Sequence, residues 1–152
     1  MDLDALRAAL AASPDNIPLL LLTAKAYQDQ FELEEAAKLI GHVLEIEPDN
    51  AQGGTEQARL LDLDGKTSEA IVRLDALTAQ HPECGKAWLL RAHLALKEGE
   101  ANNARSYYDS AVRCNGELRD DDLLERIVKS GGMNSERGDT RMAVTSSGQF
   151  VE

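Results

Sequence analysis

Residues 14–50, PDNIPLLLLTAKAYQDQFELEEAAKLIGHVLEIEPDN, show one period of a pattern that continues along the 152-residue chain. Three prolines stand at equal intervals in the sequence, and two columns of alanines keep the same spacing: Pro14, Pro48 and Pro82; Ala24, Ala58 and Ala92; Ala36, Ala70 and Ala104. A fixed period of about 34 residues is typical of a helix–turn–helix solenoid, in which each repeat buries its apolar face against its neighbours. The spacing therefore predicts an all-α fold.

Each repeat holds two stretches with the hydrophobic period of an α-helix. Apolar residues recur three or four positions apart, as in Ala36, Ile40 and Val43, which is the spacing of an amphipathic helix. The helices predicted from this period cover residues 17–29, 33–46, 51–64, 67–80, 85–98 and 101–114. Alanines let the paired helices approach closely, and a column of large residues fills the space beside them: Ile40, Leu74 and Tyr108.

The joints between these helices have their own sequence signals. The prolines cannot continue a helix and therefore mark the boundary between one repeat and the next. Asn16 and Asn50 follow two of the prolines and are candidate N-caps. Gly65 and Gly99, again one period apart, lie where the chain must reverse direction within a repeat.

Together these columns resemble those of the tetratricopeptide repeat family. That family's pattern has a large, a small and a large residue in the first helix, then a small, a large and a small residue in the second, then proline. The matching residues are Leu20, Ala24, Tyr27, Ala36, Ile40, Val43 and Pro48; Ala58, Leu61, Ala70, Leu74, Leu77 and Pro82; and Trp88, Ala92, Ala95, Ala104, Tyr108 and Ala111. Two positions depart from the pattern, because Gly54 replaces a bulky residue and Gly116 stands where proline is expected.

The resemblance covers roughly residues 1–130 and implies a right-handed superhelical solenoid of antiparallel helix pairs. Its three repeats span residues 17–50, 51–84 and 85–118, and another kind of helical-hairpin solenoid is the alternative. Residues 1–12, with Leu3, Leu6 and Leu10 on one face, and residues 119–130 are predicted as capping helices. Residues 131–152, rich in glycine, serine and threonine, are predicted to be a disordered tail or linker.

Glycines weaken the second repeat. Gly53 and Gly54 open the helix predicted at residues 51–64, and glycine costs about 1 kcal/mol relative to alanine inside a helix. We interpret this segment as a loosely formed helix end, for which Gly54→Leu would raise thermal stability. The alternative is a notch that accepts a side chain of a partner.

The composition excludes several classes of partner. The net charge is −11 and the pI about 4.7, which argues against binding to nucleic acid or to an anionic membrane. No run of 18 apolar residues predicts a membrane span, and no basic segment near Met1 predicts a secretory signal. Cys84 and Cys114 lack the spacing of a metal site and are expected to be reduced thiols of a cytoplasmic protein.

The sequence shows no set of residues that would carry catalysis. His42, His81 and His93 are spread over the chain, and no glycine-rich phosphate loop is present. Residues 62–65 (DLDG) resemble part of a calcium loop, but the ligand spacing fails that pattern. We therefore predict a protein that is not an enzyme and that carries no cofactor and no metal.

The resemblance places a peptide-binding groove on the first helix of each repeat. Its predicted residues are Lys25 and Gln28; Gln52, Thr55 and Arg59; and Lys86, Leu89, His93 and Lys97. Lys25, Arg59 and His93 follow one another at intervals of one period and can all be basic, which favours an acidic peptide or a C-terminal carboxylate as the ligand. The alternative is that these are ordinary solvated side chains. Of the two-carboxylate clamp used by part of the family, Lys86 fits one position, whereas Glu56 and Leu90 do not fit.

Three functional classes follow from these features of the sequence. The first is an adaptor or scaffold that binds a protein or peptide partner. The second is a regulatory or substrate-recruiting N-terminal domain of a larger protein, such as an ATPase. The third is a self-associating scaffold, for which the leucines of residues 1–12 are the candidate surface. The chain is predicted to be either a monomer or a weak homodimer.

Overall fold

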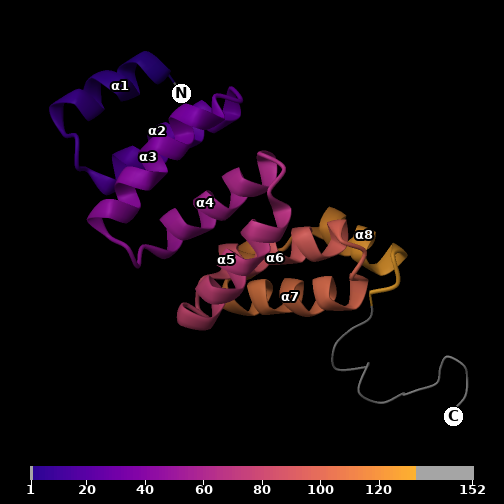
Figure 1. The fold of residues 1–152 in the computed structure, drawn as a ribbon. Coiled ribbons are helices and arrows are strands. Elements are labelled where there is room, and N and C mark those ends of the chain that lie inside the picture. The colour runs from indigo at the N-terminus through magenta and orange to yellow at the C-terminus, as the bar shows by residue number, and fades with distance from the viewer. Residues whose placement is uncertain (1, 133–152) are drawn as a thin grey trace, which may run out of the picture. The chain divides into compact units, whose positions relative to one another are not determined.

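The computed structural model describes residues 2–132, and within this range the chain forms eight α-helices and one short 3-10 helix (Figure 1). They are α1 (Leu3–Ala12), α2 (Ile17–Asp29), α3 (Leu33–Ile46), α4 (Ala51–Leu63), α5 (Thr67–Gln80), α6 (Gly85–Lys97), α7 (Ala101–Cys114), η1 (Gly116–Leu118) and α8 (Asp121–Lys129). The predicted all-α fold is confirmed. The six inner helices, α2 to α7, begin and end within one residue of the predicted bounds.

The helices form two compact units, Met1–His81 and Pro82–Glu152, called unit 1 and unit 2 below. In unit 1, α2 packs against α3 and α4 against α5, while α1 lies on α2 and α3 contacts α4. In unit 2, α6 packs against α7, and α8 and η1 contact α7. The division into three repeats and two caps stays a prediction.

The alanine columns lie in the cores of the two units. All six alanines of the two columns are at most 2% exposed, so the close approach of paired helices that they predicted is confirmed. The column of large residues is buried beside them, with Ile40 at 1%, Leu74 at 0% and Tyr108 at 3% exposure. Tyr108 is buried with its hydroxyl accepting the backbone N–H of Asp120 at 2.9 Å, which fixes the start of α8.

The N-caps predicted from the sequence are present. The Asn16 side chain accepts the N–H of Leu19 at 3.1 Å, and the Asn50 side chain accepts the N–H of Gly53 at 2.7 Å. Each bond satisfies one of the amide groups that the first turn of a helix leaves without a partner. These caps set the starting points of α2 and α4, the helices that carry the predicted groove residues of unit 1.

Four helices end in the same hydrogen-bonded turn. Beyond each of α2, α4, α6 and α8, an N–H returns to a carbonyl five residues earlier, in a Schellman motif: Glu32 to Tyr27, Lys66 to Leu61, Glu100 to Ala95 and Gly132 to Ile127, at 2.8–2.9 Å. The residue before each donor has a positive φ: 59° at Phe31, 83° at Gly65, 81° at Gly99 and 102° at Gly131. The expected turn glycines are thus explained, and a phenylalanine occupies the same position in the first repeat.

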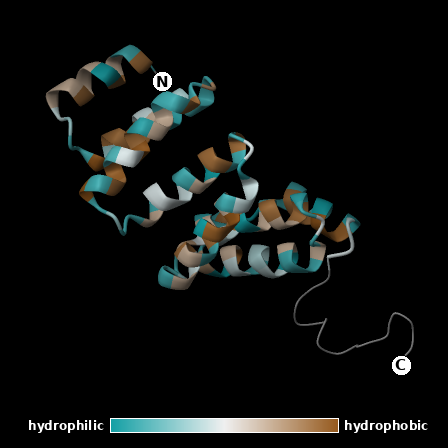
Figure 2. Ribbon diagram, in the orientation of Figure 1, coloured by the Kyte–Doolittle hydropathy of each residue, from teal (hydrophilic) through white to brown (hydrophobic). Residues whose placement is uncertain are grey.

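The start of α4 differs from the interpretation based on its glycines. Helix α4 is regular from Ala51, and Gly53 is buried. A Cβ atom at Gly54 would lie 3.3 Å from Cδ1 of Leu77, so this leucine of α5 already occupies the space of the missing bulky residue. Figure 2 shows the start of α4 in pale colours, which mark intermediate hydropathy. A leucine at position 54 would require Leu77 to move aside, and the stabilising effect of Gly54→Leu stays a prediction.

The structure describes both ends of the helical region. Leu6 is buried and Leu3 and Leu10 are half-buried where α1 lies on α2, so these leucines take part in the packing of unit 1, and self-association through residues 1–12 stays a prediction. At the other end, Gly132 is buried, and it closes the turn after α8. Gly131 and Gly132 belong to this turn, and the rest of the predicted tail, residues 133–152, lies outside the described residues.

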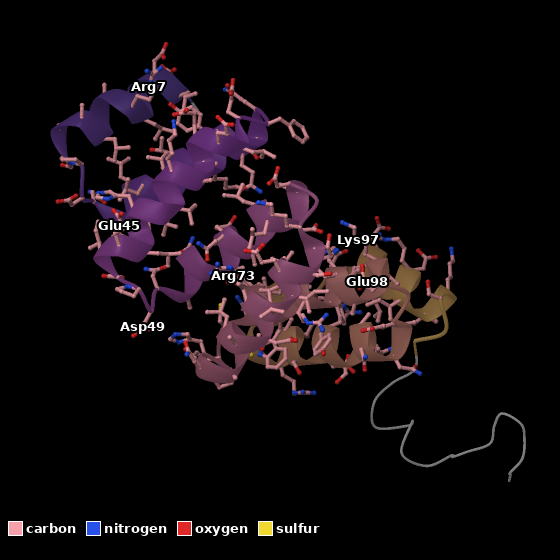
Figure 3. The ribbon with its side chains drawn as sticks, in the orientation of Figure 1. Arg7, Glu45, Asp49, Arg73, Lys97 and Glu98 are labelled. Carbon is pink, nitrogen blue, oxygen red and sulfur yellow. The ribbon has the colours of Figure 1, made fainter. Side chains whose placement is uncertain are left out.

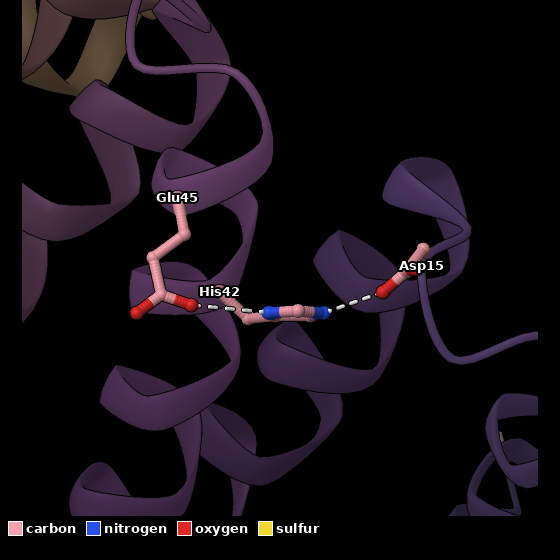
Figure 4. Close-up of polar contacts among 3 residues, drawn as sticks. All are labelled: Asp15, His42 and Glu45. Atoms are coloured by element: carbon pink, nitrogen blue, oxygen red, sulfur yellow. Dashed lines mark hydrogen bonds and ion pairs between the residues drawn. The ribbon is translucent and has the colours of Figure 1, made fainter.

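A surface histidine links the loop before α2 to α3. Figure 4 shows His42 between two carboxylates: its Nε2 lies 2.8 Å from Oδ1 of Asp15 and its Nδ1 lies 3.3 Å from Oε1 of Glu45. The hydrogen bond to Asp15, followed by that to Glu45, raises the pKa of His42 above its usual 6.5. The protonated imidazole is therefore favoured by the folded chain.

This histidine makes stability depend on pH. Because its pKa is higher in the folded than in the unfolded chain, its stabilising contribution is complete below about pH 6.5 and is lost as the pH rises through the folded pKa. We expect wild type to melt slightly above His42→Gln at pH 5.5, with a difference that shrinks toward pH 8.5. Thermal melts followed by circular dichroism test this, and a difference that is constant across the range would contradict it.

Candidate peptide-binding surface

In unit 1 the predicted groove residues come from α2 and α4. Lys25 is exposed, and Gln28, one turn further along α2, is half-buried. On α4, Gln52 is exposed at the first turn and Arg59 lies half-buried two turns later. Within residues 2–132, Lys25 makes no ion pair, so its charge is available to a ligand.

Arg59 is the less available of the two cations in unit 1. Its Nε donates to Oε1 of Glu56 at 3.2 Å, one turn earlier on α4. An ion pair at this spacing contributes little to stability, but it partly neutralises the charge that an acidic ligand would meet. A ligand carboxylate would have to share Arg59 with Glu56 or displace it.

Thr55 does not belong to this surface. It is 1% exposed, and its hydroxyl donates to the carbonyl of Ala51 at 2.8 Å, within α4. Thr23 on α2 is 0% exposed and makes the same bond to the carbonyl of Leu19, at 2.7 Å. Each hydroxyl makes its hydrogen bond within its own helix, so the threonines can pack as small core residues. The prediction that Thr55 contacts a peptide is therefore wrong.

In unit 2 the predicted residues form one stripe along α6. Lys86, Leu89, His93 and Lys97 follow one another at intervals of three, four and four residues, which places them on one face of the helix. Lys86 and Lys97 are exposed, whereas Leu89 and His93 are half-buried. Lys97 stands in the last turn, where the helix macrodipole favours a cation (Figure 3). We call these four residues the α6 stripe.

An aromatic cluster that the sequence did not reveal supports α6 on its other side. The rings of Trp88 and Tyr107 stack with centroids 6.0 Å apart, and the guanidinium of Arg91 lies 4.7 Å from the Tyr107 centroid. Arg91 is only 7% exposed. The cluster joins α6 to α7 by stacking and cation–π attraction, and it limits the rotation of the α6 stripe.

The beginning of α6 is held by one carbonyl group. The carbonyl oxygen of Pro82 accepts a hydrogen bond from Nε1 of Trp88 at 2.9 Å and a second one from Sγ of Cys114 at 3.3 Å. Cys84 and Cys114 are free thiols, as the sequence predicted. The loop that leads into Lys86 is thereby tied to both helices of the pair.

The described residues contain neither a metal-binding cluster nor a membrane-spanning helix. Across residues 2–132, no three His, Cys, Asp or Glu side chains gather in a way that would hold a metal ion. None of the helices in the same range has the length and apolar character needed to cross a membrane.

The comparisons with known proteins give the fold. No family model and no curated protein sequence matches the chain. Among solved structures, it is similar to the thermophilic tetratricopeptide repeat protein TTC0263 of Thermus thermophilus (19% identity, 84% of this chain and 70% of that chain covered, TM-score 0.68). It also resembles the first tetratricopeptide repeat domain of Spaghetti (RPAP3) bound to the HSP90 peptide SRMEEVD, with 16% identity, 75% of this chain and 89% of that chain covered, and a TM-score of 0.63. A third similar structure is the TPR2B domain of yeast Sti1 in complex with pHsp70, with 19% identity, 75% of this chain and 94% of that chain covered, and a TM-score of 0.63.

These similar structures confirm the fold that the repeated columns of the sequence predicted. The chain has the helical fold of tetratricopeptide repeat proteins. The individual groove residues, Thr55 excepted, stay predictions.

Proposed function

We propose that this protein is a non-enzymatic protein-interaction module that binds an acidic peptide segment of a partner through α6, the first helix of the helix pair in unit 2. The observation that carries the proposal is the α6 stripe, in which two exposed lysines and His93 flank the half-buried Leu89. On a chain of net charge −11, two lysines on one face of α6 attract acidic segments while the rest of the surface repels them.

The arrangement within the stripe suits an extended peptide. Leu89 offers an apolar contact between Lys86 and His93, and Lys97 lies two turns beyond Leu89. A peptide that alternates acidic and apolar residues could pair with the cations and cover Leu89 together. Lys25 on α2 of unit 1 is a second cation of the same predicted set.

The solved structures support a peptide ligand without fixing its identity. The peptide in the Spaghetti complex, SRMEEVD, has three acidic residues and one arginine. Two clamp positions of this chain differ from those that grip such a terminal carboxylate, however. Leu90 is 5% exposed, and Glu56 is paired with Arg59 at 3.2 Å. We therefore propose an acidic ligand that differs from the C-terminal tails of chaperones.

Charge reversal in the α6 stripe tests the proposal. The probe is a fluorescently labelled peptide that alternates glutamate with leucine and serine, and its matched control has glutamine in place of glutamate. We expect Lys86→Glu/Lys97→Glu to weaken binding of the acidic probe by about 100-fold or more, since each lost charge contact is worth roughly 1.4 kcal/mol or more. Fluorescence anisotropy gives the dissociation constants.

A matched variant separates the stripe from the overall charge. Arg113→Glu/Lys129→Glu changes the net charge by the same amount at exposed positions on α7 and α8. Binding should survive this change nearly intact. Equal weakening by the two variants, or equal affinity for the glutamine peptide, would disprove the proposed site.

A further inference from the structure

Phe31 is in a conformation that its side chain disfavours. It occupies the turn between α2 and α3 with φ at 59°, where Gly65 and Gly99 stand in the two following turns. The hydrogen bonds are the same in all three turns, with the N–H of Phe31 donating to Gln28 at 2.9 Å and that of Glu32 to Tyr27 at 2.9 Å. A bulky residue in the left-handed region is strained, whereas glycine is not.

The aromatic ring gives the fold little in return for this strain. Phe31 is 78% exposed, the largest exposure of any large hydrophobic residue in the described part of the chain. A glycine would make the same turn without strain and without an exposed ring. Strained backbone conformations cluster at binding and active sites, so Phe31 marks this turn as a candidate site.

A pocket opens where α3 begins, two residues after Phe31. It has a volume of about 350 Å³, and apolar side chains of α3 and α4 line it: Leu33, Ala37, Leu60 and Leu61. Glu34 and Asp64 stand among its lining residues, together with Lys66. The pocket belongs to unit 1 alone. We call Phe31 and this pocket the turn surface.

The charges around the turn surface are mainly negative. Asp29, Glu32 and Glu34 are all exposed, and within residues 2–132 none of them forms an ion pair. The lysine of the pocket, Lys66, is paired with Asp64 at 3.7 Å. The turn surface therefore complements a cationic ligand, which is the opposite of the ligand proposed for the α6 stripe.

We propose that the turn surface docks a basic amphipathic segment of a partner protein. An apolar side chain of that segment enters the pocket between α3 and α4, and a second one packs against Phe31. Its lysines or arginines pair with Glu32 and Glu34, and one of them can lie over the Phe31 ring. A second copy of this acidic chain fits less well, because its charge would meet like charge. This proposal does not rest on the acidic ligand of the α6 stripe.

The probe for this surface is a labelled 14-residue peptide of two LKKLLKK heptads, and its control has glutamate in place of every lysine. We expect the lysine peptide to bind the full chain and the glutamate peptide not to bind. Phe31→Gly should weaken binding by about tenfold or more while raising the melting temperature, because it removes both the anchor and the strained backbone. A loss of binding in a more stable protein cannot result from misfolding.

Matched variants separate this surface from general attraction of a basic peptide. Glu34→Lys should weaken binding about tenfold. Asp49→Lys makes the same change in charge in the turn that follows α3, at the end of that helix away from Glu34, and should leave binding unchanged (Figure 3). Val72→Ala removes a different exposed apolar side chain, 68% exposed on α5, and should leave binding unchanged. Lys86→Glu/Lys97→Glu should also leave it unchanged, which separates this proposal from the α6 stripe.

Four outcomes would overturn the proposal. Equal loss with Glu34→Lys and Asp49→Lys would mean attraction to the overall charge alone. Unchanged binding by Phe31→Gly would show that the Phe31 side chain does not contact the peptide. A wild-type dimer that becomes a monomer in Phe31→Gly, measured by sedimentation, would assign the surface to a second copy. Competition by a synthetic peptide of residues 133–152 would assign it to this chain's own C-terminal segment.

Discussion

Replacing Ile40 by alanine is expected to lower the free energy of unfolding by about 2–5 kcal/mol. Ile40 is 1% exposed on α3 and packs in one cluster with Ala24, Ala36 and Leu60, which come from three helices of unit 1. The two neighbouring alanines cannot extend into the vacated space, and the larger residues around the cluster can fill it only by moving. The cost of the residual cavity adds to the lost transfer free energy of the removed carbons.

Chemical denaturation followed by circular dichroism measures this effect. Val72→Ala is the matched control, since it also truncates a β-branched residue in a helix, but at a position that is 68% exposed. The control should change the free energy of unfolding by no more than about 0.5 kcal/mol. A loss below about 1 kcal/mol for Ile40→Ala would contradict the core described for unit 1.

Gly85→Ala should destabilise the chain by about 1–3 kcal/mol, although helix propensity alone favours alanine. Gly85 is the first residue of α6 and is buried against η1 and α7. A Cβ atom there would lie 2.6 Å from Cδ1 of Leu118, 3.1 Å from the carbonyl oxygen of Ala111 and 3.1 Å from Cβ of Cys114. The Leu118 side chain would have to move, and the Ala111 carbonyl, which belongs to the helix backbone, would have to give by a few tenths of an ångström.

The same substitution at Gly41 should have the opposite sign. Gly41 lies in the middle of α3, and among the described residues no neighbouring side chain would come within 4 Å of its new Cβ atom. The gain in helix propensity is then uncompensated, and Gly41→Ala should stabilise the chain by about 1 kcal/mol. Thermal and urea unfolding of the two variants test the pair, and a stabilising Gly85→Ala would refute the close contact of α6 with η1.

The sequence predicted the helices well because their signals are local and periodic. Asn16, Asn50 and the three prolines fix where helices begin, and the alanine columns report which faces meet. The predicted bounds of α2, α3, α5 and α7 are those of the structure. Caps and periodicity act within a few residues, so they can be read without knowledge of the rest of the fold.

Predictions that depended on contacts between helices were less successful. Gly54 was interpreted as a missing core residue, because the sequence does not show that the side chain of Leu77 lies next to it. Thr55 looked like a groove residue, but its hydroxyl is satisfied within α4 and the side chain is buried. Phe31 was missed although a signal was present, since it stands one repeat period before Gly65 and therefore at a glycine position of the turn.

The tryptophan bonded to the Pro82 carbonyl makes the two units distinguishable by spectroscopy. Trp88 is the chain's single tryptophan, and its surroundings, Tyr107 and the loop at Pro82, belong to unit 2. Its emission should therefore follow the melting of unit 2, whereas circular dichroism averages over every helix. Two superimposable unfolding curves would mean that the chain melts as one cooperative body, and separated midpoints would give each unit its own stability.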